Sequence, residues 1–154
     1  MKTSFVMHSP VGKIYVETED EQLVKLEYHC NKKVTSRKLD IFSSRVKKQI
    51  ETYFQSSQAT FTVPVTLTGT LFQKKVWRAM QKIPVGQTRT YGDISEQLQS
   101  SPRAVGNACR ANPVPLIVPC HRVIAKSGVG GFGGKTSGRN IDCKNWLLEH
   151  EACH

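Results

Sequence analysis

The sequence predicts an α+β protein built from two small units, residues 1–66 and 67–154. In the first unit, residues 13–18 and 23–28 are strand-like runs around an acidic turn, a pattern typical of a β-hairpin. Residues 44–55 then place apolar side chains at helical spacing. The second unit changes to short helical patterns separated by Gly, Pro and polar turns. The first unit carries no recognisable chemistry, so we expect it to act as a scaffold.

The composition is that of an ordinary globular protein. Of the 154 residues, 38% are hydrophobic and 22% are charged, which is the usual balance of soluble domains. No apolar run approaches the roughly 18 residues that a membrane span needs. The N-terminal residues show neither a signal peptide nor a lipidation motif. We therefore expect a soluble, cytoplasmic protein that makes no contact with membranes.

Positive charge is concentrated in the second half of the chain, within a formal net charge of +10. Residues 1–65 hold 10 Lys and Arg against 7 Asp and Glu, a net +3. Residues 66–154 hold 12 against 5, a net +7. A basic half-chain indicates a polyanionic partner, usually nucleic acid, although such charge also serves solubility alone.

Five cysteines are present, and their spacing argues against a metal site or a disulfide framework. The number is odd, the gaps are long and no C-x-x-C pair occurs. His29 and Cys30 are adjacent, but neighbours on a strand point to opposite faces and make poor ligands for one ion. We expect free thiols in a reducing compartment, with no metal and no cofactor.

Two short helices of the second unit are predicted to form a helix-turn-helix. A first helix begins after Thr70, which opens a capping box, and ends at Pro84. A helix over about residues 91–99 follows it. Ser101 then caps a helix over about residues 102–111, with a proline at its first position.

The last of these helices has the face of a DNA-recognition helix. Arg103, Asn107 and Arg110 stand at i, i+4 and i+7 and form one polar, basic face. Ala104 and Gly106 are small, which lets a helix backbone approach a surface closely. A solvated helix of a plain bundle is the alternative, but it would normally carry longer side chains and some acids.

Residues 116–124 form an apolar, strand-like run with Cys120 in its middle. A single cysteine is usually a buried hydrophobe. Here His121 and Arg122 follow it, and burying such side chains is costly unless they have partners. A glycine-rich loop over residues 128–138 comes next and permits tight turns against a ligand or DNA. This context indicates a reactive site.

As a nucleophile, Cys120 needs a base and a group that orients the base. The thiolate is the attacking species, and an unperturbed thiol has a pKa of about 8.5. His121 is the nearest base. Adjacent side chains on a strand diverge, so a turn or a bridging water must join the two. Glu151 is the best candidate to orient His121, and other carboxylates compete with it: Glu149, Asp93 and Glu96.

Residues 119–124, PCHRVI, resemble the active-site signature of the O6-alkylguanine-DNA alkyltransferases. The similarity covers nearly all of residues 69–151, and the start of the first unit resembles the family more weakly. The matching positions are Gly69-Thr70, Trp77, Ile83-Pro84, Gly86, Thr90-Tyr91, Arg103-Ala104-Val105-Gly106, Asn112-Pro113, Lys144, Trp146-Leu147-Leu148 and Glu151. The resemblance implies an RNase H-like first unit and a winged-helix second unit.

The resemblance also implies a reaction: direct DNA repair in which a methyl or other alkyl group moves once, irreversibly, from O6-alkylguanine to Cys120. O4-alkylthymine is a second candidate substrate. His121 would take the thiol proton through a water, and Glu151 would hold His121. Asn112 would brace the turn before the active-site strand. Tyr91 would help rotate the phosphate and give a proton to the leaving guanine.

The implied partner is double-stranded DNA that contains O6-alkylguanine, bound by a monomer through the minor groove. Arg103 would enter the duplex in place of the flipped nucleotide. Ser101, Asn107 and Arg110 are the other expected DNA contacts, together with Tyr91. A base inside a stack hides its O6 alkyl group, so flipping is a physical requirement of the reaction.

The base pocket is expected to involve Phe132, Val123 and Pro115. Phe132 stands where the family commonly has Tyr, which removes one hydroxyl contact to guanine. Residues 135–143 are longer and more polar than the usual link to the last helix. Both departures bear on which alkyl groups are accepted.

Three other functions are weighed against this one. A non-catalytic reader of alkylated DNA would not need Cys120, because relatives of that type lack the acceptor thiol. A Cys–His hydrolase would not need the basic helix-turn-helix. A plain transcription factor leaves PCHRVI unexplained.

Overall fold

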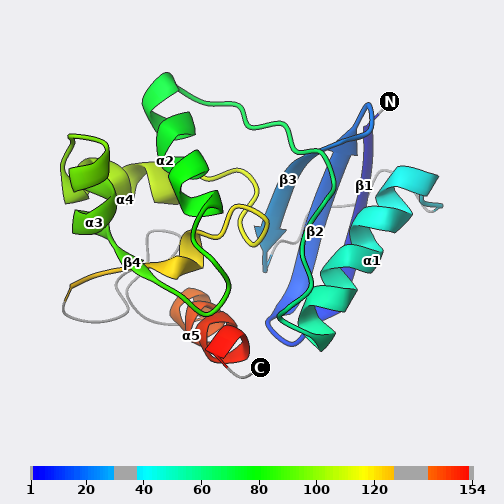
Figure 1. Ribbon diagram of the computed structural model, residues 1–154. Coiled ribbons are helices and arrows are strands. Elements are labelled where there is room, and N and C mark those ends of the chain that lie inside the picture. The colour runs from blue at the N-terminus through cyan, green and yellow to red at the C-terminus, as the bar shows by residue number, and fades with distance from the viewer. Residues whose placement is uncertain (1, 30–37, 127–138, 153–154) are drawn as a thin grey trace. The chain divides into compact units, whose positions relative to one another are not determined.

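The computed structural model describes residues 2–29, 38–126 and 139–152, and the chain divides after Leu67 into two compact units (Figure 1). No helix within these ranges is long and apolar enough to cross a bilayer. The same ranges contain no group of His, Cys, Asp and Glu arranged to hold a metal ion.

The first unit contains a three-stranded antiparallel sheet in the order β1-β2-β3. Its strands are β1 (Lys2–Ser9), β2 (Gly12–Glu19) and β3 (Gln22–Tyr28). The predicted hairpin is confirmed as β2 and β3. Asp20 and Glu21 both have positive φ angles, of 51° and 60°, which is the geometry that a tight two-residue hairpin turn requires. Strand β1, which the sequence analysis did not identify, pairs with β2 along its whole length.

Helix α1 (Ile41–Gln55) contacts this sheet through β1 and lies beside it in Figure 1. It begins three residues before the predicted helix, because the side chain of Asp40 caps it by accepting from the Ser43 amide at 2.7 Å. The predicted apolar face is confirmed at Val46, Ile50 and Tyr53, which are buried.

The second unit is mainly helical, with one short pair of parallel strands. Its elements are α2 (Leu71–Gln81), β4 (Arg89–Thr90), α3 (Tyr91–Gln97), α4 (Pro102–Arg110), η1 (Cys120–Arg122), β5 (Val123–Ile124) and α5 (Arg139–Ala152). The capping box at Thr70 is confirmed by two reciprocal hydrogen bonds with Gln73, of 2.9 and 3.1 Å. Strands β4 and β5 pair in parallel, with Arg89 opposite Val123, and this pairing joins the segment before α3 to the segment after η1.

Helices α3 and α4 form the predicted helix-turn-helix. Ser101 caps α4 by accepting from the Ala104 amide at 3.1 Å. The buried face of α4 consists of Val105 and Ala108. The indole nitrogen of Trp77 in α2 donates to the carbonyl oxygen of Ala108 at 2.9 Å, which fastens α4 to α2.

The predicted strand over residues 116–124 is wrong. Only Val123–Ile124 is a strand, and Cys120–Arg122 is a single turn of 3-10 helix. The chain reverses before it, with Leu116 at a φ of 81° and the Val118 amide bonded to the Val114 carbonyl at 3.0 Å. A continuous apolar run indicates that a segment is buried, but it does not show that the backbone is extended. The sequence pattern therefore could not distinguish this compact turn from a strand.

Helix α5 (Arg139–Ala152) begins inside the segment over residues 135–143 that was expected to lead into the last helix. Residues 139–143 therefore belong to the helix. The expectation of a long polar link over residues 135–143 is wrong for that part, and residues 135–138 lie outside the described residues.

Candidate functional site

Cys120 opens the 3-10 turn and is buried, with 7% of its surface exposed. Its amide donates to the Val118 carbonyl at 2.8 Å. Burial raises the pKa of the Cys120 thiol, and the Asn112 amide and the Lys144 charge act in the opposite direction. The Cys120 thiol therefore stays protonated until a base removes its proton.

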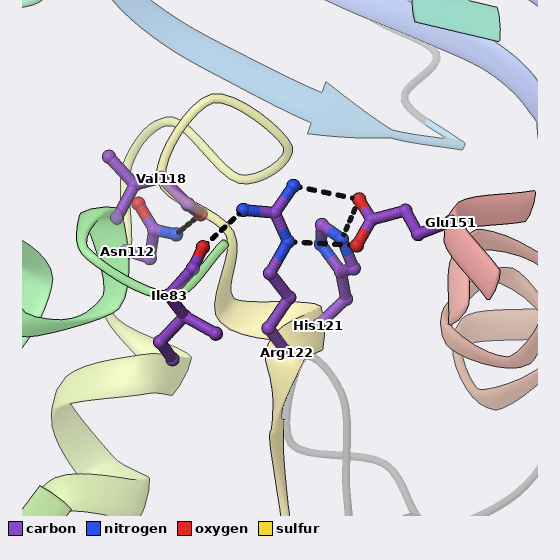
Figure 2. A network of polar contacts seen from close by, with 6 residues as sticks. All are labelled: Ile83, Asn112, Val118, His121, Arg122 and Glu151. Atoms are coloured by element: carbon purple, nitrogen blue, oxygen red, sulfur yellow. Dashed lines mark hydrogen bonds and ion pairs between the residues drawn. The ribbon is translucent and has the colours of Figure 1, made fainter. Parts of the chain in front are cut away.

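His121 follows Cys120 and is fully buried. Its Nε2 lies 2.7 Å from Oε2 of Glu151 in α5, and Figure 2 shows the two side chains facing each other. A carboxylate accepts hydrogen bonds and does not donate them, so Nε2 carries the proton of the neutral ring. Nδ1 then has a lone pair, and it is buried with no hydrogen-bond partner within the part of the chain that the structure describes.

The protonation state of His121 is set mainly by burial. Burial lowers the pKa of His121 below its usual range, and the hydrogen bond and charge of Glu151 oppose this shift. Arg122 and Lys144 lower it further. The imidazole of His121 is therefore neutral. Its Nε2 is bonded to Glu151, its Nδ1 has a free lone pair, and Cys120 precedes it in the chain.

Asn112 braces the segment between α4 and the 3-10 turn. Its Nδ2 donates to the Val118 carbonyl at 2.8 Å, and its Oδ1 accepts from the Val114 amide at 3.0 Å. Both bonds join backbone groups of the reversing segment. One side chain therefore closes the chain reversal over residues 114–118, which leads into the 3-10 turn at Cys120.

Lys144 in α5 is the residue that the sequence analysis missed as part of the site. It is fully buried, and its Nζ donates to the Val123 carbonyl at 2.7 Å and lies 5.8 Å from the centroid of the Tyr91 ring. Burial lowers the pKa of Lys144 to about 8 and raises that of Tyr91 to about 12. A signal existed in the sequence: Lys144 and Glu151 are seven residues apart, which is two helical turns on one face.

Two further thiols lie near Cys120, and they behave as core residues. Burial is the main cause that raises the pKa of both Cys109 and Cys143 to about 12. Cys109 contacts Met80, with 3.6 Å between the sulfur atoms. Unlike Cys120, neither is adjacent to a histidine.

Four of the five residues expected to contact DNA lie at exposed positions of the helix-turn-helix, and Tyr91, the first residue of α3, is half-buried. Ser101, Arg103, Asn107 and Arg110 are all exposed. The Ser101 hydroxyl is engaged as the cap of α4. A methyl group added at Gly106 would meet no atom within 4 Å, so packing inside the protein does not require a glycine there.

The expected base pocket is only partly described. Val123 is buried, and its carbonyl is occupied by Lys144. Pro115 is half-buried and lies on a backbone bridge with Val118. Phe132 lies outside the described residues.

Fold and site together define a class: a two-unit α+β chain whose helix-turn-helix unit holds a buried cysteine next to a His–Glu pair. Residues 4–67 match the ribonuclease-like domain of 6-O-methylguanine DNA methyltransferase. Residues 71–153 match the DNA binding domain of the same family.

Individual relatives agree with this match. A methylated-DNA–protein-cysteine methyltransferase of Metallosphaera sedula is 38% identical over 146 residues, which covers 93% of this chain and 88% of the relative. The crystal structure of the Mycobacterium tuberculosis O6-methylguanine methyltransferase is 37% identical, with a TM-score of 0.83, and 99% of this chain and 93% of that one are covered. The Mycobacterium tuberculosis OGT in complex with DNA is 38% identical, with a TM-score of 0.78 and coverage of 96% and 91%.

The chain therefore belongs to the 6-O-methylguanine DNA methyltransferase family. The fold class expected from the sequence is confirmed: a ribonuclease-like N-terminal domain precedes a C-terminal DNA-binding domain.

Proposed function

We propose that this protein repairs DNA directly, by moving a methyl or other alkyl group from O6 of guanine in double-stranded DNA onto Sγ of Cys120. The observation that carries the proposal is the neutral His121, bonded to Glu151 at Nε2 and bare at Nδ1, on the same 3-10 turn as a buried thiol. The names of the relatives describe the same chemistry for those proteins.

The proton and electron pairs balance in this reaction. Nδ1 of His121 accepts the thiol proton through a bridging water, and the Cys120 thiolate attacks the alkyl carbon. A C–S bond forms as the C–O6 bond breaks, and guanine leaves with the electron pair. Tyr91 gives a proton to the leaving guanine; burial raises the pKa of this phenol to about 12, so it carries its proton at neutral pH. The thioether product is not cleaved by water, so each molecule acts once.

Recognition of DNA is assigned to the exposed face of α4. We infer that Arg103 fills the space of the flipped nucleotide and that Asn107, Arg110 and Ser101 contact the backbone, with Tyr91 near the rotated phosphate. The net charge of +7 in residues 66–154 supports a polyanionic partner. The open space at Gly106 supports close approach of the helix to the minor groove.

The decisive experiment is the intact mass of the protein after mixing with a duplex that contains O6-methylguanine. We expect a gain of one methyl group, located by peptide mapping to the segment with Cys120. Cys120→Ala should abolish the gain and retain binding to the alkylated duplex. Cys109→Ala is the matched control, because it removes another nearby thiol, and it should still take up the methyl group.

Two outcomes would refute the proposal. Methyl uptake by Cys120→Ala on another cysteine at the wild-type rate would move the acceptor elsewhere. Binding to the alkylated duplex with no mass change in the wild-type protein would make the chain a reader of damage rather than a transferase.

A further inference from the structure

Arg122 is buried in the site, and all three of its guanidinium nitrogens make hydrogen bonds (Figure 2). Nε donates to Oε1 of Glu151 at 2.8 Å, and Nη2 donates to Oε2 of Glu151 at 3.0 Å. Nη1 donates to the Ile83 carbonyl at 2.7 Å. Burying an arginine is costly unless it is fully paired, so a side chain held this way has a specific role.

The arrangement fixes the Glu151 carboxylate in two directions. The two-point contact with Arg122 sets the plane of the carboxylate. The bond to Ile83 anchors the guanidinium to the backbone just beyond the end of α2. Oε2 of Glu151 is shared, because it accepts from Nη2 of Arg122 and from Nε2 of His121. The guanidinium therefore determines where the acceptor for His121 lies.

We propose that Arg122 is a positioning residue of the alkyl-transfer reaction: it holds Glu151 so that the carboxylate binds Nε2 of His121 and leaves Nδ1 to take the Cys120 proton. The inference rests on the proposed function for the identity of the reaction. The role assigned to Arg122 concerns the orientation and charge of the base, and it is separable from the nature of the alkyl donor.

The charge of Arg122 has a second consequence for His121. The charged groups that act on this imidazole are Glu151 and Lys144 from α5 and Arg122 from its own turn, and the titratable Cys120 precedes it in the chain. Burial lowers the pKa of His121, Glu151 opposes the shift, and Arg122 and Lys144 add to it. Removing the Arg122 charge therefore raises the pKa of His121. A protonated imidazole accepts no proton, so the acid side of the rate profile must move to higher pH.

Two substitutions separate orientation from charge. Arg122→Lys keeps the charge and loses the two-point contact, while Arg122→Gln loses both. Single-turnover methyl transfer from an O6-methylguanine duplex is measured across pH. In parallel, the rate of Cys120 modification by iodoacetamide is followed by mass spectrometry. Arg45→Lys and Arg45→Gln, at an exposed position of α1, are the matched controls.

For Arg122→Lys we expect the acid side of the profile to stay in place and the plateau rate to fall about tenfold, since small misplacements of a reacting group cost up to about a hundredfold. For Arg122→Gln we expect the same fall and an acid side moved to higher pH. A wild-type plateau in Arg122→Lys, or a wild-type acid side in Arg122→Gln, would overturn the proposal.

Separate control measurements test whether the variants fold and whether the proposed function holds. Each variant is compared with the wild type by circular dichroism and melting. If a variant unfolds, NMR of the wild-type protein decides: the Arg122 Nε–H should exchange slowly, with His121 protonated at Nε2. Rapid exchange, or protonation at Nδ1 alone, would overturn the proposal. If Cys120 reacts with iodoacetamide but takes no methyl group from the duplex, the proposed function fails, and the iodoacetamide profiles still test Arg122.

Discussion

Lys144 Nζ donates a hydrogen bond of 2.7 Å to the carbonyl oxygen of Val123, three residues after Cys120, although the lysine is fully buried. A buried ammonium is held at a cost, and its charge acts on the groups around it. The Lys144 charge lowers the pKa of Cys120 against the larger effect of burial.

Replacing Lys144 should therefore make the Cys120 thiol a weaker acid. In Lys144→Met the stabilising charge is gone, so the pKa of Cys120 rises and its reaction with iodoacetamide at neutral pH slows. The pH dependence of that rate, measured at the Cys120 peptide, reports the change. Lys75→Met, at an exposed position of α2, should leave it unaltered. An equal pKa of Cys120 in all three proteins would show that Lys144 acts on the thiol only through packing.

The same lysine should give stability a particular pH dependence. The pKa of Lys144 is about 8 in the folded protein, against an ordinary 10.5. Between these values the unfolded chain binds more protons than the folded one, so the contribution of Lys144 to the free energy of unfolding rises with pH and is lowest below pH 8.

Denaturant unfolding of the wild type and of Lys144→Met measures that contribution as a difference. The buried thiols act with the opposite sign, because their pKa values are raised. Cys109 and Cys143, with pKa values of about 12, stay protonated below pH 10.5 in both folded proteins and cancel in the comparison. Cys120→Ala, introduced into both proteins, removes the thiol whose pKa the Lys144 charge lowers. We expect the wild type to gain up to about 3 kcal/mol on the variant from pH 8 to 10.5. A difference that stays flat with pH would contradict the lowered pKa.

Two glycines of the second unit should respond in opposite ways to alanine. A methyl group at Gly69 would lie 2.5 Å from Cη2 of Trp77 and 2.6 Å from Oε1 of Gln73, and the buried indole cannot move away. Gly69→Ala should lower the free energy of unfolding by about 1–3 kcal/mol. Gly106→Ala meets open space inside α4 and should raise it by about 0.5–1 kcal/mol.

Melting curves test the stability of both variants, and DNA binding gives the second measurement for Gly106→Ala. If α4 lies against the duplex, the added methyl group weakens binding while it stabilises the fold. Gly106→Ala with unchanged affinity for the O6-methylguanine duplex would mean that this part of α4 does not approach DNA closely.

Arg103→Ala should separate base flipping from chemistry. Flipping a base out of the stack costs a few kcal/mol, and an arginine inserted in its place would offset part of that cost, so we expect transfer from duplex DNA to slow about tenfold or more. A free O6-methylguanine base needs no flipping, and its rate should stay close to that of the wild type. Arg78→Ala removes an equal charge from the exposed surface of α2 and controls for general attraction. Equal slowing on both substrates would assign Arg103 a structural or purely electrostatic role.

Local features of this protein could be predicted from the sequence because they depend on neighbours in the chain. The capping box at Thr70 and the Ser101 cap involve atoms within three residues of each other. The hairpin turn at Asp20 and Glu21 and the helix-turn-helix follow from the same short-range rules. The PCHRVI motif indicated the family and, with it, Cys120 as the candidate acceptor, because the resemblance combines several residues at fixed spacing.

Only the tertiary structure decided how the site is assembled. Glu151 was chosen among competing carboxylates as a candidate, and its contact with His121 spans thirty residues of chain. The 3-10 turn at Cys120 follows a chain reversal that the Asn112 side chain closes by bonding to backbone groups of Val114 and Val118. The sequence by itself therefore determined which chemistry this chain carries. The packing of α5 against the turn decided which charges surround that chemistry, because burial and distance across the fold set a pKa and local spacing does not.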